Sequence, residues 1–232
     1  MELNTHNEIY KKCKSKNIPI EHVCEVGVYL PETSNVLEFI LDGVRTTLVE
    51  PDPKNILAIN KFFKKNNNIT LHSIAIFDYN GVIELSQREA STFVSSLESS
   101  PALVNDNYVN NNADNFEVEC KTFDSIDDGS IDLLSIDTEG CEWYVIKNMI
   151  SRPKIISIET HGKAYINPFI KEITGWMKMN DYVLWFKDSS DSIYVIKDLF
   201  QISSSDQFNL GWINLTLSLN RLKYKIKKMF VN

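Results

Sequence analysis

Residues 133–143 read LLSIDTEGCEW, an apolar run that ends at Asp137 and is followed by two more acids, Glu139 and Glu142, around Gly140. A short apolar run of this kind is typical of a buried strand. Burying carboxylates costs free energy unless a cation or hydrogen-bond donors compensate, and this stretch contains no Lys or Arg. The stretch therefore predicts a strand whose acidic end has a functional reason.

Length and charge favour one globular domain. The chain has 232 residues, 43% of them hydrophobic, which is enough for a full-sized core within a single α/β domain. Its net charge of -7 argues against a protein that coats nucleic acid, so a nucleic-acid partner is not expected. The N-terminus is polar and no run reaches the roughly 18 apolar residues of a membrane span, so we expect a soluble protein.

The cysteines indicate a reducing compartment. The four cysteines form no CxxC pair, and two of them fall in segments that read as buried strand or helix. This pattern favours reduced cysteines that pack in the core over a disulfide framework or a zinc site. We therefore expect a cytoplasmic protein.

Hydrophobic periodicity predicts an α/β fold. Helix-like stretches separate most of the strand-like runs, which implies right-handed βαβ units and a mainly parallel sheet with helices on both faces. A short polar link, KDSSDS, joins the last two strands and suggests a hairpin with one antiparallel strand. The predicted strands are 23–28, 46–49, 69–76, 131–136, 155–158, 182–186 and 192–196. The predicted helices are 33–41, 55–65, 141–150 and 168–179.

Two regions depart from this alternation of strands and helices. We expect residues 1–200 to form a single domain with an irregular insertion at about 77–128, where turn, small-residue and Asn-rich segments follow one another. Residues 201–232 form a basic amphipathic tail, since from residue 211 onward the chain contains five Lys and Arg residues and no acid. Such a tail can lie on an anionic membrane or partner, or it can pack on its own domain.

The strand ends predict a cofactor site. In open parallel sheets, ligands bind outside the carboxyl ends of the strands. Glu25 and Gly27 belong to the end of the first run, and Gly27 lets the backbone approach a ligand closely. Glu50 follows the second run, where an acidic side chain can accept both hydroxyls of a ribose. A cofactor that contains a nucleoside fits both features.

The glycine pattern separates the cofactor classes. A dinucleotide requires G-x-G-x-x-G and a P-loop requires GK[ST], and the sequence has neither. S-adenosylmethionine carries an adenosine, an amino-acid group and a sulfonium cation, so its pocket needs few glycines and tolerates several acids. The carboxylates after residue 136 would then lie beside a cation that reduces the cost of keeping them charged. We predict S-adenosylmethionine as cofactor, with S-adenosylhomocysteine as product, and we include Ala75 among the cofactor-binding residues.

Six blocks of sequence, in this order, resemble the FkbM-type methyltransferases. This class I family depends on S-adenosylmethionine and mostly O-methylates sugars and other natural-product hydroxyls. The resemblance covers residues 23–197 and implies a Rossmann-like class I methyltransferase fold with a mainly parallel seven-stranded sheet, helices on both faces and one antiparallel strand near the C-terminal edge. The blocks are EVGVYLPETS, VEPDPKNILAINKFFKKN, LHSIAIFDYNGVIEL, VECKTFDSI, IDLLSIDTEGCEWYVIKNM and KIISIETHG. The most specific parts are EPDP at 50–53 and DTEGCE at 137–142.

The resemblance also implies residue roles. Glu25 and Gly27 would shape the methionine end of the cofactor pocket, Glu50 would hold the ribose, and Asp137 would face the methyl group. The chain departs from the family pattern at two positions. It has Pro31 where the family usually has a second glycine, and Ser135 where the family often has Lys.

The predicted reaction is transfer of a methyl group to a hydroxyl of a sugar or glycan. A hydroxyl is a poor nucleophile while protonated, so a general base helps as the new bond forms. His161, directly after the strand IISIET, is the first candidate because imidazole titrates near neutrality, and Asp137 and Glu139 are the next. Glu142 can instead be a first-turn acid that interacts with the helix dipole.

A metal is conceivable but not expected. A divalent ion held by Asp137, Glu159 and His161 would use ligands that are easy to find together by accident. For the acceptor, Trp143, Tyr165 and Tyr108 are candidates to stack on a sugar ring.

Two other functions stay open from the sequence. The fold can serve as a non-catalytic module that binds a ligand or a partner, because Pro31 replaces a cofactor-site glycine. An RNA or protein methyltransferase is the third reading, although such a substrate calls for a basic cleft and only the tail is rich in Lys and Arg.

Overall fold

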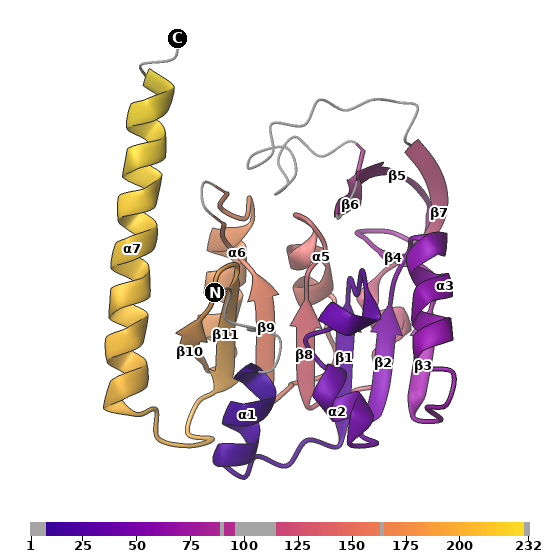
Figure 1. Ribbon diagram of the computed structural model, residues 1–232, viewed down its shortest axis with the longest axis horizontal. Coiled ribbons are helices and arrows are strands. Elements are labelled where there is room, and N and C mark those ends of the chain that lie inside the picture. Colours follow the sequence, from indigo (N-terminus) through magenta and orange to yellow (C-terminus); the bar gives the residue numbers. More distant parts are fainter. Residues whose placement is uncertain (1–7, 89–90, 96–114, 163–164, 230–232) are drawn as a thin grey trace.

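The computed structural model describes residues 8–88, 91–95, 115–162 and 165–229. Figure 1 shows a twisted sheet seen with its parallel strands roughly vertical, helices in front of and behind it, and one long helix along one side. The sheet positions the functional site, because the carboxyl ends of its parallel strands meet at one edge.

The main sheet confirms the predicted fold class. Six of its strands run parallel to one another and β11 is antiparallel to both of its neighbours, β9 and β10. The strands lie in the order β10 (Tyr182–Lys187), β11 (Asp191–Ile196), β9 (Ile155–Glu159), β8 (Leu133–Ile136), β1 (His22–Val26), β2 (Arg45–Val49) and β3 (Ile69–His72). All seven predicted strands are present in this sheet, although 69–76 contributes only its first half.

Helices cover both faces, as the near-continuous apolar strands require. One face packs against α5 (Glu142–Lys147) and α6 (Ile170–Met179), and the other against α1 (Glu8–Ser15), α2 (Leu37–Leu41) and α3 (Pro53–Phe62). Successive residues of one strand alternate between the two cores. Leu133 belongs to the α1 side, whereas Leu134 and Ile136 belong to the α5 side.

A second sheet stands over the carboxyl end of the first (Figure 1). Its strands lie in the order β4 (Ala75–Ile76), β7 (Asn115–Lys121), β5 (Gly81–Arg88) and β6 (Ser91–Val94). The interval expected to be an irregular insertion thus contributes three strands in its described parts. The alternation of exposed Val82 and Glu84 with buried Ile83 and Leu85 is the period-two signal of a half-buried strand.

Several predicted elements were wrong in extent, among them the helix predicted at 141–150, where α5 covers only Glu142–Lys147. The run 69–76 divides into β3 and β4, which belong to different sheets. The helix predicted at 33–41 begins only at Leu37, after a 3₁₀ turn at Pro31–Thr33. The Glu25 carboxylate accepts hydrogen bonds from the Ser34 hydroxyl and the Asn35 N–H, and these bonds hold a turn where periodicity alone favoured a helix.

The tail forms a single helix, α7 (Ser204–Met229), beside the edge strand β10. Within the described ranges, no helix has the length and apolar character needed to cross a bilayer. The four cysteines are free thiols and all are buried, which agrees with their predicted role in packing.

Candidate active site

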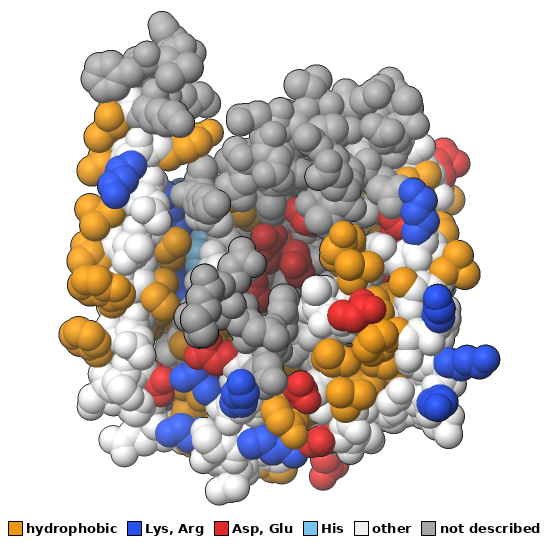
Figure 2. Space-filling view, in the orientation of Figure 1, with side chains coloured by type: hydrophobic (Ala, Val, Ile, Leu, Met, Phe, Trp, Pro, Cys, Tyr) orange, Lys and Arg blue, Asp and Glu red, His pale blue; other side chains and the backbone are white. Residues whose placement is uncertain are grey.

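A pocket of about 410 Å³ opens at the carboxyl ends of the parallel strands. This volume lies within the usual range for small-molecule sites. All five residues predicted to bind the cofactor line it, namely Glu25, Gly27, Glu50, Ala75 and Asp137. Acidic side chains are visible in the hollow of the face shown in Figure 2.

Gly27 brings two strand ends into contact. Its φ of +85° is left-handed, and a Cβ built on it would lie 1.7 Å from the carbonyl oxygen of Asp137. The neighbouring backbone is tied on both sides, because Gly27 N–H donates to Val49 and Asp137 N–H donates to Val26. Only glycine fits this position, so the loop after β1 can lie directly against the end of β8.

Glu50 holds the pocket wall through its own hydrogen bonds. Its Oε2 accepts the N–H groups of Val28 at 3.1 Å and Tyr29 at 2.9 Å. Its Oε1 accepts the Asp52 N–H at 2.9 Å and the Asn55 amide at 3.2 Å. Burial raises the pKa of Glu50, while these four bonds favour its charged form. Glu50 therefore ties the β1 loop to the start of α3 in addition to lining the predicted ribose end.

Glu25 is buried beneath the pocket. Burial raises its pKa to about 7, and the bonds from Ser34 and Asn35 act in the opposite direction. The Asn35 amide also donates to Ser135 Oγ at 3.1 Å. Ser135, where the family often has Lys, is thus part of the link between the turn before α2 and strand β8.

The segment after β8 is a tight turn stabilised by Glu142. Glu139 and Gly140 both have left-handed backbone, with φ of +54° and +107°. The Glu142 carboxylate folds back and accepts the N–H groups of Thr138 at 2.9 Å and Gly140 at 3.0 Å. Its other oxygen accepts the Asn167 amide. Glu142 is therefore a buried structural acid. Its hydrogen bonds stabilise this turn, whereas the sequence had suggested an interaction with the helix dipole.

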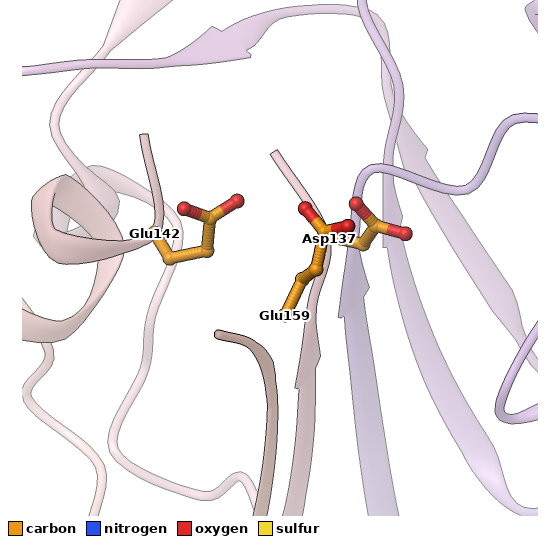
Figure 3. Close-up of side chains that lie close together, drawn as sticks. All are labelled: Asp137, Glu142 and Glu159. Carbon is orange, nitrogen blue, oxygen red and sulfur yellow. The ribbon is translucent and has the colours of Figure 1, made fainter. Parts of the chain in front are cut away.

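Three carboxylates converge beside the pocket. One oxygen each from Asp137, Glu142 and Glu159 lies within 4.8 Å of the others (Figure 3). Burial and then the charge of Glu139 raise the pKa of Asp137 well above its usual range, although Asp137 lines the open pocket. Burial and then Asp137 raise the pKa of Glu159, whose Oε2 has no hydrogen-bond partner among the described residues.

This arrangement differs from the metal set considered from the sequence, because Glu142 takes the place of His161. Three carboxylate oxygens this close can share protons, or they can neutralise a cation. Glu142 already accepts hydrogen bonds on both of its oxygens. That the site needs no metal stays a prediction.

His161 lies away from the pocket lining, whereas Asp137 and Glu139 line it. The His161 ring is buried, with Nε2 3.3 Å from the Asp188 carbonyl and Nδ1 2.9 Å from the Thr160 hydroxyl. A carbonyl can only accept, so Nε2 carries the proton and Nδ1 accepts from Thr160. Burial lowers the pKa of His161 to about 4. The structure brings together the second and third candidates for the base and not the first.

The sequence reasoning missed one wall of the pocket. Asp188, Ser190 and Asp191, in the hairpin between β10 and β11, line it. The Asp191 carboxylate accepts from Ser157 and Ser190, each at 2.9 Å, and burial raises its pKa to about 7. The polar KDSSDS link predicted this hairpin, but nothing local to it indicated that an antiparallel strand would place it beside the ends of the parallel strands.

Of the three aromatic residues predicted to stack on the acceptor, the two that the structure describes differ in their exposure. Tyr165 has none of its surface exposed, so it cannot stack on a ligand in this arrangement, and that prediction was wrong. Trp143 is partly buried against the core on the α5 side. Tyr108 lies outside the described residues.

The comparison with known families decides the identity of the fold. The family model described as the methyltransferase FkbM domain matches residues 25–184, more than half of the chain. The chain belongs to the FkbM methyltransferase family. Membership implies the use of S-adenosylmethionine, and the acidic side chains that line the pocket, Asp137 among them, fit a cofactor that brings a cation. No curated protein matches the chain.

Solved structures of other methyltransferases are only distantly similar to this chain. The SAH-bound methyltransferase PaMTH1 of Podospora anserina is 13% identical, with a TM-score of 0.49 over 84% of this chain and 78% of that one. The methyltransferase domain of bacterial CtHen1 is 12% identical, with a TM-score of 0.46 over 84% of this chain and 97% of that one. Likenesses at this distance carry no argument about substrate.

Replacing Gly27 with Ala tests the contact between the strand ends. The new Cβ would meet the Asp137 carbonyl, so we expect Gly27→Ala to lower the free energy of unfolding by about 2–5 kcal/mol, from overpacking and backbone strain together. Gly43 is the matched control, since it has a φ of +80° but open space around its Cβ. Gly43→Ala should cost about 1 kcal/mol from strain alone. Equal losses in urea unfolding would contradict the proposed contact.

Proposed function

We propose that the protein is an S-adenosylmethionine-dependent O-methyltransferase that acts on a hydroxyl group of a sugar or glycan. The observation that supports this most is the sharing of one pocket. Asp137 and Glu139, the candidate proton acceptors, line the same cavity as Glu25, Gly27 and Glu50. A cofactor held by the second group would therefore meet an acceptor held near the first.

The residues that line the pocket have separate tasks in this proposal. Bound S-adenosylmethionine supplies an electrophilic methyl group on a positively charged sulfur. Gly27 lets the loop after β1 lie against the end of β8 and lines the pocket there, and Glu50 fixes the wall where the ribose is expected. Asp137 contributes negative charge, which favours a cation close to it. These residues bind and orient, and alignment is the main requirement of an in-line methyl transfer.

Asp137 is our candidate for the proton acceptor. Burial and neighbouring acids raise its pKa, and a bound sulfonium would favour its charged form, which is the form that can accept a proton. Glu139 lines the pocket beside it. His161, with both ring nitrogens engaged and a lowered pKa, is less suited in this arrangement.

The far wall of the pocket suits a carbohydrate. Leu85 and Val94 of the second sheet contribute apolar lining, and Asp188 and Ser190 contribute polar lining. Sugars present both kinds of surface, since their ring faces are apolar and their hydroxyls donate and accept hydrogen bonds. A polyanionic acceptor such as RNA fits this wall poorly, because the described lining contains several acids and no Lys or Arg.

The acceptor class can be tested by turnover. The purified protein is incubated with isotopically labelled S-adenosylmethionine and panels of saccharides, phenols, RNA and protein, and release of S-adenosylhomocysteine is followed. We expect turnover with a member of the saccharide panel and a mass increase of one methyl group on oxygen. Turnover with phenols, RNA or protein and none with saccharides would refute the substrate class. Binding of the cofactor without any turnover would favour the binding-module alternative.

Asp137→Asn tests the role of negative charge. The substitution removes a charge that attracts the sulfonium, so the affinity for S-adenosylmethionine should fall by about tenfold. The affinity for S-adenosylhomocysteine, whose sulfur carries no charge, should fall by much less. In the wild type, the preference for the cation should weaken as the pH falls and Asp137 takes up a proton.

The control for this variant is Asp124→Asn, at an exposed carboxyl outside the pocket lining, which should leave both affinities unchanged. Calorimetric titration measures the four affinities. Equal losses for the two ligands in Asp137→Asn would contradict an electrostatic role.

A further inference from the structure

Helix α7 carries apolar side chains on two opposite faces. The side that meets the domain is buried or half-buried and includes Asp206, Leu210, Ile213 and Leu217. The opposite side, here called the outer stripe, consists of Phe208, Trp212, Leu215, Leu219, Leu222 and Ile226, and all six are exposed. Their intervals of four and three residues place them on one face over about 27 Å of helix.

The inner face is fixed to the domain at its start. Asp206 pairs with Lys12 at 2.8 Å and accepts a bond from the Trp185 ring nitrogen at 3.4 Å. The helix then runs along β10, with its C-terminal end at the same end of the molecule as the carboxyl ends of the parallel strands (Figure 1). Because these contacts set the rotation of the helix, the outer stripe must face away from the domain. Figure 2 shows apolar side chains along this outer edge.

The outer stripe is far more exposed than apolar side chains on a solvated surface usually are. Phe208 is 73% exposed and Trp212 is 64% exposed, and both are large aromatic groups. A contiguous row of this kind marks an interaction surface. The inner face already accounts for the contact with the domain, so the outer stripe needs another occupant.

Charge indicates which occupant. After Asp206 the chain contains no acid but has four lysines, although the protein as a whole has a net charge of -7. It also has Arg221, which is half-buried on the side that meets the domain. Lys223 is exposed on the described part of this segment. An apolar stripe with aromatic residues, followed by a basic end, is the composition of helices that lie in the interface of anionic membranes.

We infer that the outer stripe of α7 binds the surface of a bilayer that contains anionic lipids. The helix lies in the plane of the interface, with Phe208 and Trp212 inserted among the headgroups and Lys223 attracted to lipid phosphates. This inference does not depend on the reaction that the pocket performs.

Two other occupants fit less well. A second copy of α7 could match the spacing of the stripe, but parallel pairing would bring the basic ends together, and antiparallel pairing would offer no acid beyond Asp206 opposite them. A nucleic acid would match the charge but would leave six apolar side chains uncovered. A membrane satisfies both properties of the helix.

Vesicle flotation of the full chain tests the inference. We expect the protein to float with vesicles of phosphatidylcholine and phosphatidylglycerol at low salt, and to float much less with phosphatidylcholine alone or at high salt. The double variant Trp212→Ser/Leu219→Ser should reduce the partition coefficient at least about tenfold. Lys223→Gln should reduce it about fivefold.

Asn214→Ser is the matched control, because it replaces an exposed polar residue of the same helix and should leave flotation unchanged. The melting temperature and S-adenosylhomocysteine binding of each variant show that the fold and the pocket are intact. Failure of the wild type to float with anionic vesicles at low salt would overturn the inference. So would a dimer in solution that is lost in the double variant, since a second copy would then cover the stripe.

Discussion

The contact between Gly27 and the carbonyl of Asp137 is the constraint on which the site depends. It joins the loop after the first strand to the end of β8, two segments more than one hundred residues apart in the chain. Left-handed backbone at Gly27, Glu139 and Gly140 makes this approach sterically allowed, and carboxylates then hold it in place. Glu50 fastens the loop after β1, and Glu142 fastens the turn after β8, each by accepting backbone N–H groups.

The same arrangement explains the acidic character of the site. Glu50 and Glu142 are buried with most of their hydrogen-bonding capacity used by the protein, so they can be tolerated without a ligand. Asp137 and Glu159 have fewer such partners and strongly raised pKa values. A cationic cofactor near Asp137 would therefore relieve an electrostatic cost that the fold itself leaves in place. The acids after β8 thus divide into Glu142, which stabilises the turn, and Asp137 and Glu139, which line the pocket.

Sequence patterns predicted much of this and failed where tertiary contacts decided the outcome. The seven apolar runs identified the main sheet, because buried parallel strands read as continuous hydrophobic segments. Strand ends predicted Glu25, Gly27, Glu50 and Asp137 at one pocket, because parallel strands end at one edge. His161 was expected to face the pocket but is not part of its lining, because the direction of a side chain after a strand end depends on neighbours such as Thr160 and Asp188. Asp191 was missed because an antiparallel strand delivers it from the other direction.

We expect the pocket at the strand ends to bind S-adenosylmethionine and its product. Calorimetric titration of the purified protein with S-adenosylhomocysteine tests it most directly, together with the melting temperature at increasing ligand concentration. We expect saturable binding to one site with a Kd of about 1–100 μM and a ligand-dependent rise in melting temperature. A folded protein that shows neither heat of binding nor a thermal shift at about ten times the upper end of that range would exclude a cofactor site in this pocket.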